Sequence, residues 1–414
     1  MNPCIYRALS LCGLCTPSPH VVPSPPSGWL RSSLTYRLLF PRFTKATGGH
    51  TVSSALAAPH LAAPPQRNDY VFVSNVRFMS MLAIVYVHTQ ILVVTNSHLA
   101  GHIQTVLLQL LKFGTIGFFL ISGFLLGEGL TRGHRSQYFL RRLQAVLLPW
   151  LFWGLIWFLV SLSAHMLRYT NATLGSSAFI VLQQYLHFVF FYSIYWFVPN
   201  FFVCLALVLT LYNRIPNRYL GSFFFVCSLL YGINVYPELV TARHTTALLG
   251  FVFYLWLGAF AYTHRERWLH RLYNCSWAKL ATVTAAALLL SLIEYRVLAR
   301  MHPLGDPNNT LRVSNQIFSV LATLMIVKSS LRLSPSFTNP RSDTFGIYLL
   351  HPILVDLLWI ARAHAAPASI WRREVSGPVA LASLAGIFLF VYLLSLLLAQ
   401  QIGKVPGLRW SVGK

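Results

Sequence analysis

The chain has 414 residues, of which 56% are hydrophobic and only 10% are charged, and it carries a formal net charge of +23. Soluble domains usually contain about a quarter charged residues, so this composition excludes an ordinary soluble protein and indicates the membrane class. The positive charge does not indicate a nucleic-acid partner, because Lys and Arg lie mainly in short segments between apolar runs.

Residues 1–68 differ from the rest of the chain. They contain no Asp or Glu, are rich in Pro, Ser and Arg, and lack the apolar core of a secretory signal. A transit peptide fits this composition, but prolines between Pro17 and Pro26 would break an amphipathic helix. We expect either a disordered cytosolic tail or a translation start placed too far upstream. An integral membrane domain is then expected at 69–402, followed by a short cytoplasmic tail at 403–414.

Apolar runs of roughly 18–25 residues recur after residue 70, and this length crosses a hydrocarbon core of ~30 Å. They predict an all-α fold, a polytopic bundle of about ten transmembrane helices. The segment 176–194 contains Gln183, Gln184 and His187, so we expect it to lie at the interface or to re-enter the membrane without spanning it. The predicted spans are 76–95, 104–127, 143–165, 196–213, 219–237, 246–263, 278–297, 314–330, 343–361 and 377–399.

The distribution of basic residues predicts the orientation. With the N-terminus in the cytosol, the inside loops hold sixteen Lys or Arg and the outside loops hold seven. Such a bias is typical of cytoplasmic loops, so we expect both termini on the cytoplasmic side. The inside loops in this topology are 131–142, 214–218, 264–280, 328–341 and 400–414.

Two ionisable residues in the first predicted span are candidates for chemistry. Arg77 begins this span and His88 follows eleven residues later. Eleven residues turn a helix by about 1100°, close to three full turns, so both side chains leave the same face about 16 Å apart. With the N-terminus inside, Arg77 lies at the cytosolic boundary and His88 near mid-membrane, where one extended ligand could contact both. Two other interpretations stay open: a boundary arginine that binds lipid phosphates, and a histidine that packs against a neighbouring helix.

Span nine supplies a second imidazole, His351, followed by Pro352. Histidine suits general-base catalysis because its pKa lies near neutrality. Ionisable groups inside spans normally face a cavity, the bundle interior or each other. Asp356 could orient a histidine or serve a proton path, and Glu128 and Glu294 are the other acids inside the spans.

The second span and the loop after it carry a glycine face and a basic pair. Gly114, Gly117 and Gly123 form a thin face on which another helix or a ligand can pack closely. Ser122 lacks the sequence context of a nucleophile elbow. The basic pair at 141–142 could hold the phosphates of a cytosolic cofactor or anchor the loop to anionic lipid.

No metal site is predicted. Neither His88 nor His351 has a His or Glu partner three or four residues later, and Cys12 and Cys15 have no second pair to complete a site. We therefore expect no metal and no permanently bound cofactor.

Five stretches in order resemble the membrane-bound acyltransferase family 3, which acylates sugars, polysaccharides and some small molecules. The resemblance covers residues 72 to about 400. The matching stretches are Arg77 with His88, Phe118–Phe124 (FFLISGF), Phe139–Arg142 with Pro149 and Trp150, Trp196 with Phe197, and Phe345–Pro352 (FGIYLLHP). The chain departs from the family pattern at Phe78, where Gly is usual, and it has Asn75 near a position often occupied by Asp.

The resemblance implies a cytosolic acyl-CoA donor, commonly acetyl-CoA, and a hydroxyl acceptor on a carbohydrate or lipid-linked envelope glycan. It makes His88 the candidate catalytic or acyl-accepting residue, with His351 as a second catalytic candidate. It assigns Arg77 to the charged end of the donor, and Arg141, Arg142 and Ser122 to donor binding. An integral membrane location, in the inner (plasma) membrane of a bacterium, is implied as well. The expected partners are the donor, the acceptor and membrane lipid, with no nucleic acid.

A transporter or flippase of a glycan or small molecule is the alternative function. Transporters commonly show internal repeats with broken helices in matched positions. No convincing repeat relates the two halves of this sequence. We expect the outside loops 166–195 and 298–313 to shape the acceptor site, although they carry no recognisable sugar-binding signature.

Overall fold

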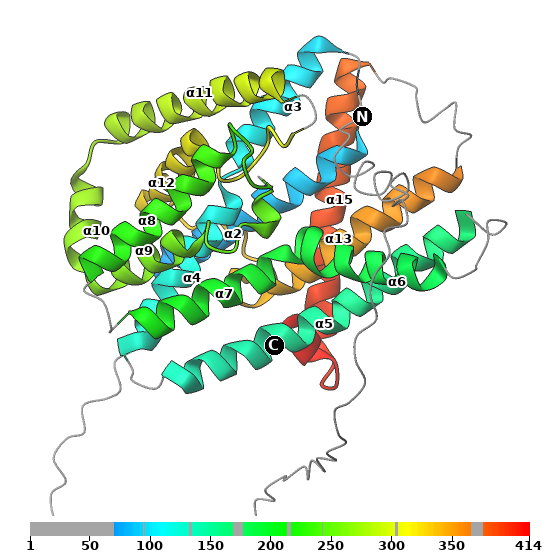
Figure 1. Cartoon of the computed structure of the whole chain (residues 1–414), viewed down its shortest axis with the longest axis horizontal. Helices are drawn as coiled ribbons and strands as arrows, with labels where there is room; N and C mark the ends of the chain where they lie inside the picture. Colours follow the sequence, from blue (N-terminus) through cyan, green and yellow to red (C-terminus); the bar gives the residue numbers. More distant parts are fainter. Residues whose placement is uncertain are drawn as a thin grey trace, which may run out of the picture. The chain divides into compact units, whose positions relative to one another are not determined.

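The structure is a computed structural model that describes residues 70–414 except 94, 96, 132–134, 169–176, 213–216, 242, 303–304 and 366–375. The predictions for residues 1–68 therefore lie outside the described residues. Regular secondary structure in the described part is helical, which confirms the all-α class (Figure 1). The helices are α2 (Val71–Thr89), α3 (His98–Leu111), α4 (Gly114–Thr131), α5 (Arg135–Arg168), α6 (Ser177–His187), α7 (Phe197–Leu211), α8 (Asn217–Asn234), α9 (Val252–Thr263), α10 (Arg265–Asn274), α11 (Trp277–Met301), α12 (Val313–Lys328), α13 (Pro340–Ala365) and α15 (Gly377–Lys404).

Seven helical stretches in the described part are long and apolar enough to cross a membrane, and they coincide with seven of the ten predicted spans. The protein is therefore an integral membrane protein. Predicted spans 246–263 and 314–330 correspond to the shorter apolar helices α9 and α12, and 219–237 corresponds to α8. The count of ten and the orientation of the termini stay predictions. The candidate spans are Val71–Leu92, His98–Leu130, Arg135–Ser163, Ile194–Leu211, Trp277–Met301, Pro340–Ala361 and Gly377–Lys404.

Residues 177–193 of the predicted segment 176–194 belong to none of these candidate spans. They form α6, then a π-helical turn, η3 (Phe188–Tyr192), and they lead into a 3₁₀ turn, η4 (Ile194–Trp196). A second 3₁₀ turn, η5 (His244–Thr246), lies between α8 and α9. The location of the segment 176–194, at the interface or re-entering the membrane, stays a prediction.

Helix α4 packs closely against α2 and α9 through its glycines. A Cβ atom added at Gly117 would lie 2.6 Å from Oγ of Ser80 in α2, and one added at Gly123 would lie 2.0 Å from the carbonyl oxygen of Leu255 in α9. Both distances are shorter than real Cβ contacts. The backbone oxygen of Leu255 cannot move aside, so only glycine permits the approach at Gly123, whereas at Gly117 the side chain of Ser80 would have to shift. The glycine face therefore serves helix packing. Helix α2 also contacts α12, α13 and α15, which places it in the interior of the bundle.

The second predicted span is interrupted. The stretch His98–Leu130 is apolar enough on average to cross a membrane, but α3 ends at Leu111 and α4 begins at Gly114. The backbone N–H of Lys112 bonds the carbonyl of Gln109 at 3.3 Å, which is the tighter i to i+3 pattern of a helix end. The break therefore puts Lys112 at a junction and not on a continuous helix face.

Candidate functional site

The structure brings the two predicted histidines together. His88 of α2 and His351 of α13 have ring centroids 5.7 Å apart, with their planes tilted by 36°. His88 lies in the last turn of α2, four residues before the end of the span Val71–Leu92. That offset is about 6 Å along the helix axis, and the position of His88 near mid-membrane stays a prediction. The two imidazoles form one pair contributed by two helices.

The hydrogen bonding of His351 determines the state of its ring. The side chain is completely buried, and Nδ1 lies 2.9 Å from the carbonyl oxygen of Ile347. A carbonyl oxygen can only accept, so Nδ1 carries a proton, and in the neutral ring Nε2 keeps a lone pair. Nε2 is buried and has no hydrogen-bond partner in the described part of the chain. A buried acceptor of this kind normally has a partner, so it is available to His88, to water or to a substrate group.

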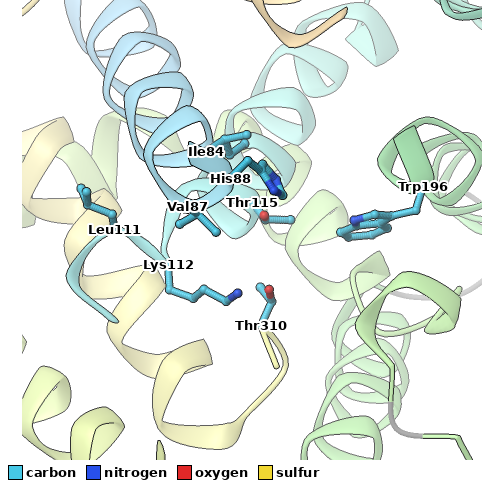
Figure 2. A pocket seen from close by; sticks show the side chains of 8 residues that line it. All are labelled: Ile84, Val87, His88, Leu111, Lys112, Thr115, Trp196 and Thr310. Atoms are coloured by element: carbon cyan, nitrogen blue, oxygen red, sulfur yellow. The ribbon is translucent and has the colours of Figure 1, made fainter. Parts of the chain in front are cut away.

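His88 lines a cavity of about 40 Å³. Its lining comes from α2, the α3–α4 junction, η4 and the segment before α12 (Figure 2). A space of this size holds a few water molecules or a small reacting group, and not a nucleotide. The lining residues are Ile84, Val87, His88, Leu111, Lys112, Thr115, Trp196 and Thr310.

Lys112 brings a positive charge to this cavity. Figure 2 shows its side chain extending from the α3–α4 junction toward Thr310. No hydrogen bond from its ammonium group is found among the described residues, whereas the charges of Asp306 and Arg312 both act on it. A cation in a confined cavity favours an anionic group or developing negative charge there.

Trp196, which forms one wall of the cavity, belongs to a turn that is fastened to α13. The hydroxyl of Tyr195 donates to the carbonyl of Leu349 at 2.5 Å, and the hydroxyl of Tyr348 donates to the carbonyl of Ile194 at 3.1 Å. These two bonds join η4 to the helix that carries His351. The same two hydrogen bonds therefore help to position Trp196 relative to His351.

A buried arginine supports the opposite wall. Arg312 is completely buried, donates to the carbonyl of Ser291 at 2.8 Å and to the side-chain oxygen of Gln109, and lies 3.9 Å from the Glu294 carboxylate. Breaking a buried ion pair is costly because it leaves an uncompensated charge. This network fixes the segment before α12, from which Thr310 reaches the cavity.

Arg77 lies on α2, and α2 is one uninterrupted helix from Val71 to Thr89. Arg77 and His88 therefore lie on one continuous helix, which their predicted common face requires. Ile84, which lines the cavity, follows Arg77 by two turns and shares this face. Arg77 itself is partly accessible and does not line the cavity.

Asn75, one of the departures from the family pattern, has a structural partner. Its side-chain amide donates to the carbonyl of Leu331 at 2.8 Å and accepts from the N–H of Leu333 at 2.9 Å. These bonds tie the start of α2 to the segment between α12 and α13. An amide, with one donor and one acceptor, satisfies both backbone groups, which a carboxylate cannot do.

The remaining donor-binding candidates do not line the cavity. Arg141 is exposed on α5 and its Nε donates to the carbonyl of Gln137 at 3.2 Å, while Nε of Arg142 donates to the hydroxyl of Tyr138 at 3.2 Å. Ser122 lies on α4 beside the contact with α9 and is partly buried. Their assignments to the donor stay predictions.

Asp356 does not orient either histidine through any hydrogen bond found in the described chain. Its carboxylate accepts from Nε1 of Trp157 at 3.0 Å and from the hydroxyl of Ser161 at 2.7 Å, both on α5. It therefore links α13 to α5. Among the described residues, no group of three or more His, Cys, Asp or Glu could hold a metal ion.

Sequence reasoning overlooked two residues of this site. Lys112 lies inside the predicted span 104–127, so the rule that ionisable residues in spans are informative could have found it. Arg312 was placed in an outside loop, and no local signal distinguishes it from an ordinary loop arginine. Only the tertiary burial of its side chain shows its role.

A family model described as an acyltransferase domain matches residues 70–400. The match covers nearly all of the described part of the chain and includes every helix that contributes to the cavity. No curated protein and no solved structure matches the chain.

Proposed function

We propose that this chain, which belongs to the membrane-bound acyltransferase family 3 and is an integral membrane acyltransferase, moves an acetyl group from cytosolic acetyl-CoA to a hydroxyl of a carbohydrate or envelope glycan. The observation that carries this proposal is the His88–His351 pair beside a cavity of acyl size that also contains Lys112. Acyl transfer needs a group that accepts a proton and a group that stabilises negative charge. The pair supplies the first and Lys112 the second.

In the proposed reaction, an imidazole nitrogen of His88 takes the proton from the acceptor hydroxyl. The hydroxyl oxygen attacks the thioester carbonyl carbon, the carbon–sulfur bond breaks, and the proton passes from His88 to the departing thiolate. A thiol with a pKa of about 8.5 leaves with little acid assistance. In the alternative form, His88 itself first takes the acyl group and then passes it to the hydroxyl.

His351 is proposed to act on His88 and not on the substrate. The protonated Nδ1 is committed to Ile347, so Nε2 can accept a hydrogen bond from a ring nitrogen of His88. Such a bond would fix the ring orientation and raise the basicity of the other nitrogen of His88. Lys112 is proposed to face the carbonyl oxygen of the thioester, which becomes an oxyanion in the tetrahedral intermediate.

The donor is proposed to extend along α2 from the cavity toward Arg77, about 16 Å away along the helix axis. In the predicted orientation this direction leads to the cytosol, where acyl-CoA is found. Arg77 would contact the charged end of the donor, with Arg141 and Arg142 on the same predicted cytosolic side. Replacing Arg77 by Ala is expected to raise the KM for acetyl-CoA more than it lowers kcat.

The test is incubation of the purified protein in lipid nanodiscs with labelled acetyl-CoA and a membrane extract as the source of acceptor. We expect release of free CoA and transfer of label to a glycan by the parent protein, and loss of both in a His88→Ala protein. A flippase would translocate glycan without consuming the thioester. Unchanged transfer by His88→Ala would overturn the assignment of this residue.

A further inference from the structure

A second and larger cavity shares Trp196 with the first. It has a volume of about 200 Å³ and lies between the π-helical turn η3 and the segment around η5. Three aromatic rings line it, from Phe191, Tyr192 and Trp196. The two cavities have different linings apart from Trp196, which belongs to both.

The rings of this cavity are held in place by local structure. The π-helical turn brings the imidazole of His187 to within 5.5 Å of the Phe191 ring and 5.0 Å of the Tyr192 ring, measured between centroids. The guanidinium of Arg243 lies 5.9 Å from the centre of the Tyr192 ring. Such π turns inside helical segments often occur at functional sites, because they redirect side chains that an α-helix would spread around its axis.

One polar atom in the lining points to a ligand. The hydroxyl of Thr245 is buried and has no hydrogen-bond partner in the part of the chain that the structure describes. The neighbouring hydroxyl of Thr246, by contrast, donates to the carbonyl of Arg243 at 3.1 Å. An unpaired buried hydroxyl carries a desolvation cost that a bound polar group would remove.

The chemistry of the lining selects the class of ligand. It combines flat aromatic faces with two threonine hydroxyls and an imidazole, and none of the described residues that line it is Asp, Glu, Lys or Arg. A neutral sugar ring has a matching surface, because its C–H groups form an apolar face and its hydroxyls form a polar edge. We propose that this cavity binds a neutral pyranose ring, and, resting on the proposed function, that this ring belongs to the acceptor.

The position of Trp196 links this binding site to the reaction. Trp196 lines both cavities, so a hydroxyl of the bound ring that reaches past Trp196 meets the cavity of His88. The turn that carries Trp196 is fastened to α13 by Tyr195 and Tyr348. The aromatic cavity therefore holds a fixed position relative to the imidazole pair, which suits the selection of one hydroxyl for acylation.

The test measures sugar binding without any donor. Methyl glycosides of glucose, galactose, mannose and N-acetylglucosamine are added to the full-length protein in lipid nanodiscs, and saturation-transfer NMR detects the bound ligands. Sorbitol serves as the control ligand, because it carries the hydroxyls of a hexose but has no ring face. We expect at least one pyranoside to bind and sorbitol not to bind.

Three variants locate the binding. Thr245→Val keeps the shape of the side chain and removes only the unpaired hydroxyl, so it should weaken pyranoside binding about tenfold without lowering thermal stability. Phe191→Ala removes an exposed ring from the lining and should weaken binding by a similar factor. Phe223→Ala is the matched control, since Phe191 and Phe223 are 49% and 55% exposed and Phe223 does not line the cavity.

Absence of binding by every pyranoside, or binding that survives both Thr245→Val and Phe191→Ala, would overturn the inference. The outcome is independent of the proposed function. A sugar site sensitive to these substitutions in a protein that consumes no thioester would refute the acyltransferase proposal and leave the cavity assignment intact. Conversely, thioester consumption with no sugar binding would refute the cavity assignment alone.

Discussion

Lys112 is the residue of the site with the most specific expected effect. If its ammonium stabilises the oxyanion, Lys112→Met should lower kcat by about 10²–10³-fold and change the KM for acetyl-CoA little. Lys112→Arg, which keeps the charge, should recover part of the rate. Lys279→Met, at an exposed position on α11, is the control. Steady-state release of free CoA is the measurement, and a Lys112→Met protein with the parent kcat would remove Lys112 from the mechanism.

The sequence identifies single residues best where an ionisable side chain lies inside an apolar span, because such side chains are rare there. His88 and His351 stand out in the sequence because imidazoles are uncommon inside apolar spans. Their meeting could not be predicted, because the contact between α2 and α13 depends on how the whole bundle packs. Thr245 gave no signal at all, since a threonine in a loop becomes informative only when its hydroxyl is buried without a partner.

At the scale of elements, the crossing of α4 and α9 is the closest helix contact that the glycines identify. A Cβ atom at Gly258 would lie 2.1 Å from the carbonyl oxygen of Leu120, and a backbone atom cannot move aside as a flexible side chain can. We expect Gly258→Val to destabilise the protein by about 3 kcal/mol or more. Gly386→Val on α15 is the control, because nothing lies within 4 Å of its added Cβ. Thermal unfolding in detergent measures both, and equal melting temperatures would contradict this account of the crossing.

Apolar run length predicted where helices lie, and each of the ten predicted spans overlaps a helix. It did not predict the interruption at Lys112 or the π-helical turn at Phe188–Tyr192. Neither the break nor the π-helical turn interrupts the run of apolar residues, so run length alone cannot reveal them. Both depend on tertiary contacts. Residues from both places line a cavity.

At the scale of the whole molecule, the groups of the proposed site follow one another from Arg77 on α2 to the aromatic cavity. Arg77 comes first along α2, the His88–His351 pair and Lys112 follow, and the aromatic cavity lies beyond Trp196. In the predicted orientation, this order would run from the proposed cytosolic donor to the proposed acceptor on the opposite side. Such an arrangement would let one site take an acyl group from one compartment and deliver it to a glycan in another.

The most direct test of the central claim is a double-mutant cycle on the imidazole pair. The rate of CoA release from labelled acetyl-CoA is compared for the parent, His88→Gln, His351→Gln and the double variant, with His102→Gln at an exposed position on α3 as control. We expect each single change to reduce the rate by about 10²–10⁴-fold, and the double change to cost no more than His88→Gln alone, because residues that act as a unit are not additive. Losses that multiply, or a His88→Gln protein as active as His102→Gln, would contradict the account.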